Sequence, residues 1–347
     1  MTEIHTQKPV LTNEIVDDFT ADDFVFVQRD ERLTDKVYEA TSYARDVWMH
    51  FKKNKGAVVG AVIIVIIALF AIFGPMFSGY NGTDIQQAQQ SLPPRIPGLE
   101  KLGIFSGTEK GVNVYAQRSF DSLYHWFGTD TNGRDLFTRV WEGTRVSLII
   151  ALVAAAIDIV IGMSYGLISG YFGGKVDMIM QRIAEVLNGI PTLVAVTLLS
   201  LILPGGMVSI IFALMITGWI GMSRIARAEM LKLKESEYVL ASRTLGARSF
   251  SIIFKDIMPN IFGQLIIMSM FSIPNAIFTE AFLSFVGLGI QAPEASLGSL
   301  ISDGYKSMTV HPFIMIFPII VLALLMLSFN LFADGIRDAF DPNQKQS

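Results

Sequence analysis

Six stretches of this chain are apolar over a length that can cross a lipid bilayer. A helix needs about 20 mostly apolar residues to span the hydrocarbon core. The stretches that meet or approach this length are 57–77, 146–170, 186–203, 207–222, 261–287 and 312–333. Because lipid offers backbone groups no hydrogen-bond partner, each stretch is expected to be a helix. The pattern predicts an all-α integral membrane protein with six transmembrane helices.

Composition narrows the class of protein further. The 347 residues are 51% hydrophobic and 17% charged, which is typical of membrane proteins and not of an ordinary soluble domain. A net charge of −4 gives no indication of nucleic acid as a partner. The chain has no cysteine, so disulfides, cysteine metal sites and cysteine nucleophiles are excluded. No basic segment followed by an apolar core opens the chain, so the first span is expected to act as its own membrane signal.

Basic residues in short loops predict the orientation. Lys52, Lys53 and Lys55 precede the first span, and Lys and Arg are frequent in the loop after the fourth. Short cytoplasmic loops carry such an excess, so both termini are predicted to be cytoplasmic. The predicted order is a cytoplasmic tail (1–55), a first transmembrane helix (56–77), an extracellular loop region (78–145), a five-helix core (146–337) with a cytoplasmic loop at 223–260, and a cytoplasmic tail (338–347). In the first tail, the first 20 residues are predicted to be disordered, and a later part is compatible with a surface or interfacial helix.

The cytoplasmic loop contains an unusual mixture of apolar and basic residues. Residues 237–260 read EYVLASRTLGARSFSIIFKDIMPN, with apolar residues mostly at helical spacing and a glycine suited to a sharp turn at Gly246. Leaving Leu240, Leu245 or Phe250 in water costs about 1.5–3 kcal/mol per side chain relative to burial. Three environments can remove that cost: the protein's own helices, the lipid interface, or another protein.

This segment resembles the EAA loop of ABC importer permeases, a short cytoplasmic helix that docks in a groove of the ATPase subunit. Ala241 and Ser242 match the two alanines of the family pattern, Gly246 its glycine, and Met258 with Pro259 its final Leu-Pro. Leu240 and Asp256 depart from it, standing where the pattern has Glu and Ile. The resemblance implies that ATPase coupling depends on Glu237, Tyr238, Val239, Leu240, Ala241, Ser242, Arg243, Leu245, Gly246, Ala247 and Pro259.

Further segments resemble the peptide and nickel permeases of this class. They include FGTDTNGRDLFTRVWEGTRVSL before the second span, EAFLSFVGLGIQAPEASLGSLISDG around the fifth and DGIRDAFDP near the end, so the resemblance covers about residues 44–342. It implies a MetI-like fold in a bacterial plasma membrane and most resembles the C-type subunit of an oligopeptide importer. Dipeptide or nickel import is the near alternative. The implied partners are a second permease, two ATPase subunits, an extracellular peptide-binding protein, the peptide and membrane lipid.

Two carboxylates inside apolar spans are candidate pathway residues. Asp158 lies in AAAIDIVIG of the second span and Glu280 in FTEAF of the fifth. A charge at the bilayer centre costs about 2.5–3.5 kcal/mol on insertion scales, so each is expected to face protein or water. Either they line the pathway, as a proton relay or as peptide contacts, or they are paired residues that fix helix packing. A proton-coupled carrier acting alone is the rival function, although such carriers usually have more spans and an inverted repeat.

Other motifs are interpreted as structural. TDTNGRD fails the calcium-loop pattern, because Gly133 comes too early, and is predicted to be a turn with side-chain caps. No phosphate-binding GxxxxGK[ST] loop or catalytic motif occurs, so the chain is expected to be non-enzymatic, without a cofactor or metal, and driven by partner ATPases. Gly162, Gly166 and Gly170 predict close helix packing. Prolines at 191, 274 and 318 interrupt spans.

Overall fold

The computed structural model describes residues 43–203 and 206–340. The predicted disorder of the first 20 residues and most of the predicted C-terminal tail lie outside these residues. The chain divides into two compact units, Met1–Asp46 and Val47–Ser347, and the helical bundle belongs to the second.

Five helical segments are long and apolar enough to cross a membrane, and a bent helix pair is a sixth candidate. The five segments are α2 (Lys55–Ser78), then α4 (Leu136–Ile157) with η5 (Asp158–Met163) and α5 (Ser164–Phe172), then α8 (Met207–Thr217) with α9 (Ile220–Leu233), then α11 (Ser249–Ser251) with η6 (Ile252–Ile257) and α12 (Met258–Phe285), and α14 (Phe313–Phe340). The bent pair is α6 (Gly174–Asn188) and α7 (Thr192–Ile202). The expected helical membrane fold is confirmed.

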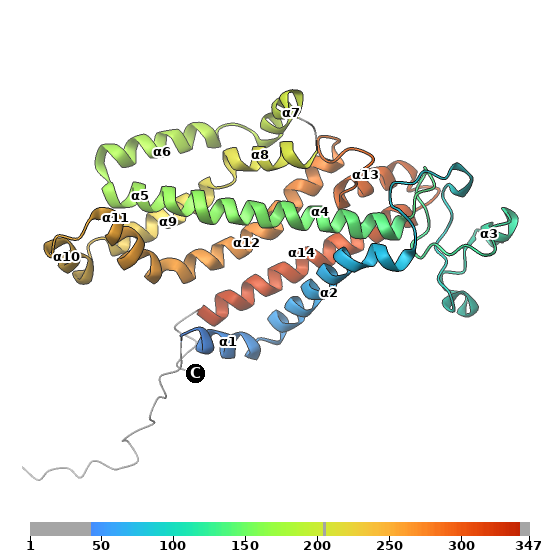
Figure 1. The fold of residues 1–347 in the computed structure, drawn as a ribbon, viewed down its shortest axis with the longest axis horizontal. Helices are drawn as coiled ribbons and strands as arrows, with labels where there is room; N and C mark the ends of the chain where they lie inside the picture. The colour runs from blue at the N-terminus through green and yellow to red at the C-terminus, as the bar shows by residue number, and fades with distance from the viewer. Residues whose placement is uncertain (1–42, 204–205, 341–347) are drawn as a thin grey trace, which may run out of the picture. The chain divides into compact units, whose positions relative to one another are not determined.

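The remaining elements are short and lie outside these segments. They are α1 (Tyr43–Lys53) before α2, then η3 (Gln87–Gln89), η4 (Leu99–Leu102), β1 (Thr108–Glu109), β2 (Val112–Asn113) and α3 (Val114–Gln117) between α2 and α4, then α10 (Glu237–Thr244), and α13 (Leu297–Ser307) between α12 and α14. β1 and β2 pair antiparallel as a small hairpin, with Thr108 opposite Asn113. Figure 1 shows α10 and α11 at one end of the bundle and the 79–135 region at the other.

The predicted third span is two helices rather than one. α6 and α7 meet at an angle of 78°. Pro191, at the break, has an extended backbone (φ −60°, ψ 130°). Proline offers no N–H and disfavours a helical residue before it, so the helix ends there instead of kinking. α12 and α14, by contrast, continue through Pro274 and Pro318.

The second span begins at Leu136, earlier along the chain than the predicted 146. The Asp135 carboxylate caps the helix, accepting a hydrogen bond from the Thr138 N–H at 2.8 Å. Such a cap satisfies one of the four N–H groups that a helix start leaves open. One turn of π-helix, η5, then begins at Asp158.

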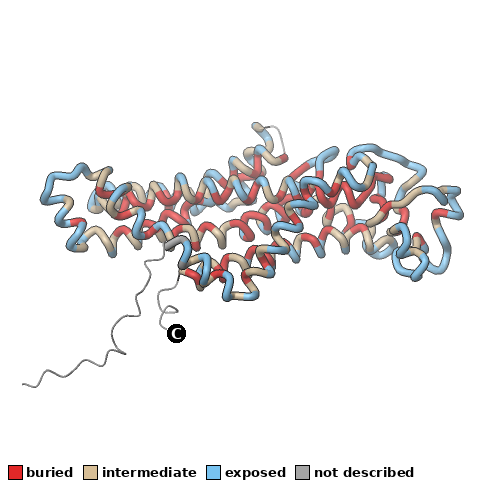
Figure 2. The backbone as a smooth tube through the Cα atoms, turned by 60° about the horizontal axis from the view of Figure 1, so that its bottom comes forward, coloured by how far each residue is buried: buried red, intermediate tan, exposed pale blue. Residues whose placement is uncertain are grey.

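Close helix packing forms the core of the bundle. α2 packs against α14 and α4, α12 against α4 and α14, and α5 against α9. Figure 2 shows buried residues along the helices inside the bundle and exposed residues concentrated at its two ends. The main apolar cluster includes Leu136, Val140, Ile150, Ile277 and Leu325.

The glycine series predicted to mediate close packing lies between α5, η5 and α9 of the same chain. A Cβ at Gly162 would stand 2.6 Å from the Trp219 carbonyl oxygen, and one at Gly166 only 2.1 Å from that of Ser223. At Gly170 it would stand 2.9 Å from the Met230 Cβ. Only glycine permits these helix backbones to approach so closely, as in small-residue contacts of other membrane helices.

The 79–135 region is an ordered cap with a polar interior. Leu92 and Tyr115 are fully buried in it, together with His125 and Asp135, whose side chains are 2.8 Å apart. The Arg95 guanidinium donates to Glu100 at 2.8 Å and holds the pKa of that carboxyl below its usual value. Polar groups that are buried in this region pair with one another.

Candidate coupling surface and buried carboxylates

α10 is a short helix with a sharp turn at its end. Gly246 has φ of +81°, the left-handed region that favours glycine. The Gly246 N–H donates to the Arg243 carbonyl at 3.0 Å, and the Ala247 N–H to that of Ser242 at 3.1 Å, which satisfies two carbonyls at the helix end. The chain then returns through α11 and η6 to α12, which carries Pro259 in its first turn. The predicted sharp turn at Gly246 is confirmed.

One side chain anchors α10 to the bundle. Val239 is fully buried in an apolar cluster with Ile253 and Ile257 of η6 and with Met230 of α9. Burying a valine contributes about 1.5–3 kcal/mol. Packing against the protein's own helices therefore accounts for this face of the loop.

Within the described residues, most of the α10 surface on either side of Val239 is exposed. Leu245 is 88% exposed, Leu240 45% and Tyr238 40%. The remaining predicted coupling residues divide the same way: Glu237, Ala241, Arg243, Gly246, Ala247 and Pro259 are exposed, and Ser242 is half-buried. We call Tyr238, Leu240 and Leu245 the α10 apolar face.

Aromatic contacts connect this region to α5. The Arg243 guanidinium lies over the Tyr171 ring at 5.6 Å from its centroid. Phe172 packs edge-on against Phe250 of α11, with centroids 6.3 Å apart. Nearby, Arg227 of α9 donates two hydrogen bonds to Asp177 of α6, at 2.6 and 2.5 Å. The contacts of Arg243 and Phe250 therefore join the α10–α11 region to α5, the continuation of the helix that carries Asp158.

Glu280 is enclosed by serine hydroxyls. It is fully buried on α12 and accepts hydrogen bonds from Ser147 of α4 at 2.6 Å and from Ser284 at 2.7 Å. Ser284 in turn accepts from the Ile290 N–H at 3.3 Å. This carboxylate joins α4, α12 and the loop after α12, an arrangement that fits the packing interpretation and leaves no open face toward a pathway.

Asp158 lies in a different environment. It is 8% exposed and borders a cavity of about 50 Å³ between α4, α8 and α12. Asp158 and Ser147, the partner of Glu280, are about 16 Å apart along α4 at 1.5 Å per residue. The two carboxylates therefore do not form the pair that a proton relay between them would need.

Polar residues that were not among the predicted site residues share the cavity with Asp158. Ser272, Asn275 and Thr279 of α12 line it. Their spacing of three and four residues places them on one helix face, and this periodicity was readable in the sequence.

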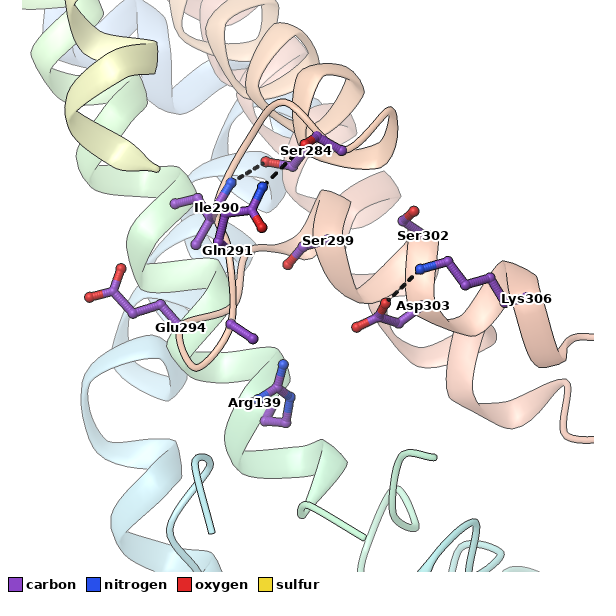
Figure 3. Close-up of a pocket in the computed structure, with 11 residues that line it drawn as sticks. Arg139, Ser284, Ile290, Gln291, Glu294, Ser299, Ser302, Asp303 and Lys306 are labelled. Carbon is purple, nitrogen blue, oxygen red and sulfur yellow. Dashed lines mark hydrogen bonds and ion pairs between the residues drawn. The ribbon is translucent and has the colours of Figure 1, made fainter. Parts of the chain in front are cut away.

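A second pocket lies at the end of the bundle that carries the cap. It measures about 250 Å³ and is lined mainly by α13 and the loop before it, with Arg139 of α4 at one side (Figure 3). Figure 3 also shows Lys306 paired with Asp303, at 3.3 Å, on the α13 side. Arg139 is 2% exposed and donates to the Gly82 and Pro293 carbonyls at 3.0 and 3.3 Å. Those bonds tie α4 to the cap and to the α12–α13 loop.

The turn predicted for TDTNGRD is present. The Asp130 carboxylate accepts from the N–H groups of Asn132 and Arg134, both at 2.9 Å, and from the Arg134 side chain at 2.7 Å. Gly133 has φ of +78°. Asp130 also lies 3.5 Å from Arg139, so these residues pair within the chain.

Comparisons with known proteins identify the family. Residues 162–346 match the model of the binding-protein-dependent transport system inner membrane component, and residues 42–94 match the N-terminal transmembrane domain of oligopeptide transport permease C. The chain belongs to this family. It is a permease subunit of an ABC importer, so it is a multi-pass membrane protein with a transport role, and ATP hydrolysis belongs to a partner subunit. A binding protein and an ATPase are its general partners.

Two curated relatives and one solved structure illustrate the similarity of this permease. It is 43% identical over 89% of its length to the oligopeptide transport system permease protein OppC of Bacillus subtilis, covering 92% of that protein. It is 40% identical over 98% of its length to the dipeptide transport system permease protein DppC of the same organism, covering 97%. The inward-facing MetNI methionine ABC transporter aligns with 57% of this permease and 95% of that chain, at 17% identity and a TM-score of 0.48.

Proposed function

We propose that this permease forms, with a second homologous permease, the pathway for ATP-driven peptide uptake. Its oligopeptide and dipeptide relatives are similarly close, at 43% and 40% identity, which supports peptides as the substrate class and leaves their length open. Both relatives carry names of peptide systems, so peptide import is favoured over nickel. The binding-protein-dependent family sets aside the alternative of a proton-coupled carrier that acts alone.

The α10 apolar face is proposed as the ATPase docking surface. The observation that supports this is the division of one short helix into a buried anchor, Val239, and exposed Leu240 and Leu245. α10 lies outside the segments that can cross a membrane, so lipid tails do not explain its exposed apolar residues. A groove on a partner protein would bury them and gain about 1.5–3 kcal/mol for each leucine.

The same proposal sets the orientation and the assembly. α10 and both termini face the cytoplasm of a bacterial cell, and the 79–135 cap faces outside, where the binding protein delivers peptide. Two ATPase subunits act on the two permeases. Closure of the ATPases moves α10, and the contacts of Arg243 with Tyr171 and Phe250 with Phe172 carry this movement to α5. Coupling of this kind requires contacts that differ between two states.

The test uses two single variants of the reconstituted transporter, Leu245→Asp and the bulky substitution Gly246→Trp. Neither side chain would clash with the fold, because Leu245 is 88% exposed and a Cβ at Gly246 meets nothing within 4 Å. The strained backbone at Gly246 makes Leu245→Asp the cleaner of the two. We expect Leu245→Asp to reduce ATPase co-purification and ATP-dependent peptide uptake at least tenfold, since it removes an apolar contact and buries a charge.

Leu102→Asp is the matched control for ATPase binding. Leu102 is 73% exposed on the cap, at the other end of the bundle. ATPase co-purification is expected to be unchanged in this variant. Normal ATPase binding and uptake in Leu245→Asp would overturn the assignment of α10 as the docking helix.

A further inference from the structure

We propose that the Asp158 cavity binds the primary ammonium group of the transported peptide within the membrane. This inference rests on the proposed function for its substrate class. It assigns to this permease a contact with the peptide terminus that is separate from any selection by the binding protein.

The cavity has a carboxylate and no cationic residue. Its lining, all within the described part of the chain, consists of Ala154, Asp158, Leu214, Gly218, Ser272, Asn275, Ala276 and Thr279. A carboxylate in the middle of a transmembrane helix ordinarily pairs with a cation or faces water. A ligand that supplies the positive charge would complete this site.

The hydroxyl groups around Asp158 are mostly committed as donors elsewhere. Thr279 donates to the Asn275 carbonyl at 2.8 Å. Ser272 lies beside Asp158 and has a single hydrogen, which can go to Asp158 or to the Ser269 carbonyl 2.8 Å away, but not to both. The Asn275 amide adds two N–H donors and one acceptor, and with the two oxygens of the Asp158 carboxylate the cavity still offers more acceptors than donors. A primary ammonium brings three N–H donors and no acceptor, which matches this surplus.

Size restricts what can enter the cavity. Its volume of about 50 Å³ exceeds the about 10–15 Å³ that one water molecule needs. An ammonium head therefore fits. The cavity is thus suited to the end of an amine, with the rest of the peptide outside it.

The cavity opens beside Asn275 of α12. Asn275 is exposed although it lies well inside the membrane-spanning part of α12. A polar side chain at that depth faces water or protein and not lipid tails. In the proposal, this side of α12 faces the pathway. Glu280 lies between one and two helical turns further along α12. It is fully buried and already accepts hydrogen bonds from two serines, so it cannot bind the ammonium group.

The binding test uses the absence of cysteine in the chain. Asn275→Cys is introduced in the assembled transporter, and its modification by a small thiol reagent is followed as a mass change of this chain. Propylammonium is the probe, and tetramethylammonium, which has the same charge but no N–H donor, is its control. We expect propylammonium to slow the modification several-fold and tetramethylammonium to have little effect.

Adding Asp158→Asn is expected to remove the protection, because the neutral amide cannot pair with the ammonium. Asp303→Asn, a carboxylate change on α13 outside the cavity, is expected to leave the protection intact. Protection that persists in Asp158→Asn, or that is equal for the two amines, would overturn the proposal. So would an Asn275→Cys thiol that does not react under conditions in which the thiol of Leu102→Cys, 73% exposed on the cap, does.

Uptake measurements separate this proposal from the proposed function. In Asp158→Asn, ATP-dependent uptake of trialanine is expected to fall about tenfold, the effect of losing one charge-assisted hydrogen bond. ATPase co-purification is expected to be unchanged.

If the unaltered transporter took up no peptide while propylammonium still protected the thiol of Asn275→Cys, the proposed substrate class would fail and the ammonium site would stand. Undiminished trialanine uptake in Asp158→Asn would count against a role of the site in transport. Peptides with an acetylated terminus and an internal lysine distinguish the terminal ammonium from a side-chain one.

Discussion

At the scale of single residues, two carboxylates that look alike in sequence have different surroundings. Asp158 and Glu280 each stand alone in an apolar run. Glu280 is enclosed by Ser147 and Ser284, which come from different helices, whereas Asp158 borders a cavity. Only one of them is therefore available to a ligand.

Glu280→Ala is expected to destabilise the folded permease by about 2–4 kcal/mol. The substitution leaves buried serine hydroxyls without their acceptor and opens a cavity where the side chain was. Thermal unfolding in detergent measures the effect. Glu294→Ala is the control, since Glu294 is exposed, and its change is expected to stay within about 0.5 kcal/mol. Equal unfolding temperatures for the two variants would contradict the structural role of Glu280.

At the scale of helices, backbone proximity determines which elements pack. The contact of α5 with α9 depends on glycines whose missing side chains let the helices approach. The same four-residue spacing in sequence is compatible with packing inside the chain or against a second permease. In the structure the space beside each glycine is filled by α9.

Gly166→Ala is expected to destabilise the bundle, by about 1–3 kcal/mol for overpacking. The added Cβ would stand 2.1 Å from the Ser223 carbonyl oxygen, a backbone atom that cannot move without shifting α9. Gly221→Ala, an exposed glycine of α9 with nothing within 4 Å of its added Cβ, is the matched control. In Gly221→Ala, the higher helix propensity of alanine is expected to stabilise the folded protein slightly. The unfolding temperatures of the two variants are measured side by side. A Gly166→Ala variant as stable as Gly221→Ala would contradict the close contact between Gly166 and Ser223 of α9.

At the scale of the whole molecule, the two ends of the bundle differ in character. One end carries α10 with its exposed leucines, and the other carries the cap with its buried ion pairs and hydrogen bonds. In the proposed orientation these ends lie on opposite sides of the membrane.

Single cysteines are expected to report that orientation. Leu102→Cys and Leu245→Cys place thiols at opposite ends of the bundle in an otherwise cysteine-free chain. Leu102 is 73% exposed and Leu245 is 88% exposed. In intact cells a membrane-impermeant thiol reagent is expected to modify the Leu102→Cys variant only. The Leu245→Cys variant is expected to react after the membrane is permeabilised and the ATPase removed. Labelling of Leu245→Cys from outside would reverse the proposed topology.

The class and the family of this protein could be predicted from its sequence. Apolar length predicted the membrane helices, and the motifs around 237–260 and elsewhere predicted the ABC importer permease, because these depend on properties that are local in the chain. Three features became visible only in the fold: how α6 and α7 bend, which glycines meet α9, and which face of α10 is free. The fold also separated Glu280 from Asp158. Their partners, Ser147 for one and the cavity-lining Ser272, Asn275 and Thr279 for the other, come from helices that only folding brings together, and no local pattern records which helix faces meet.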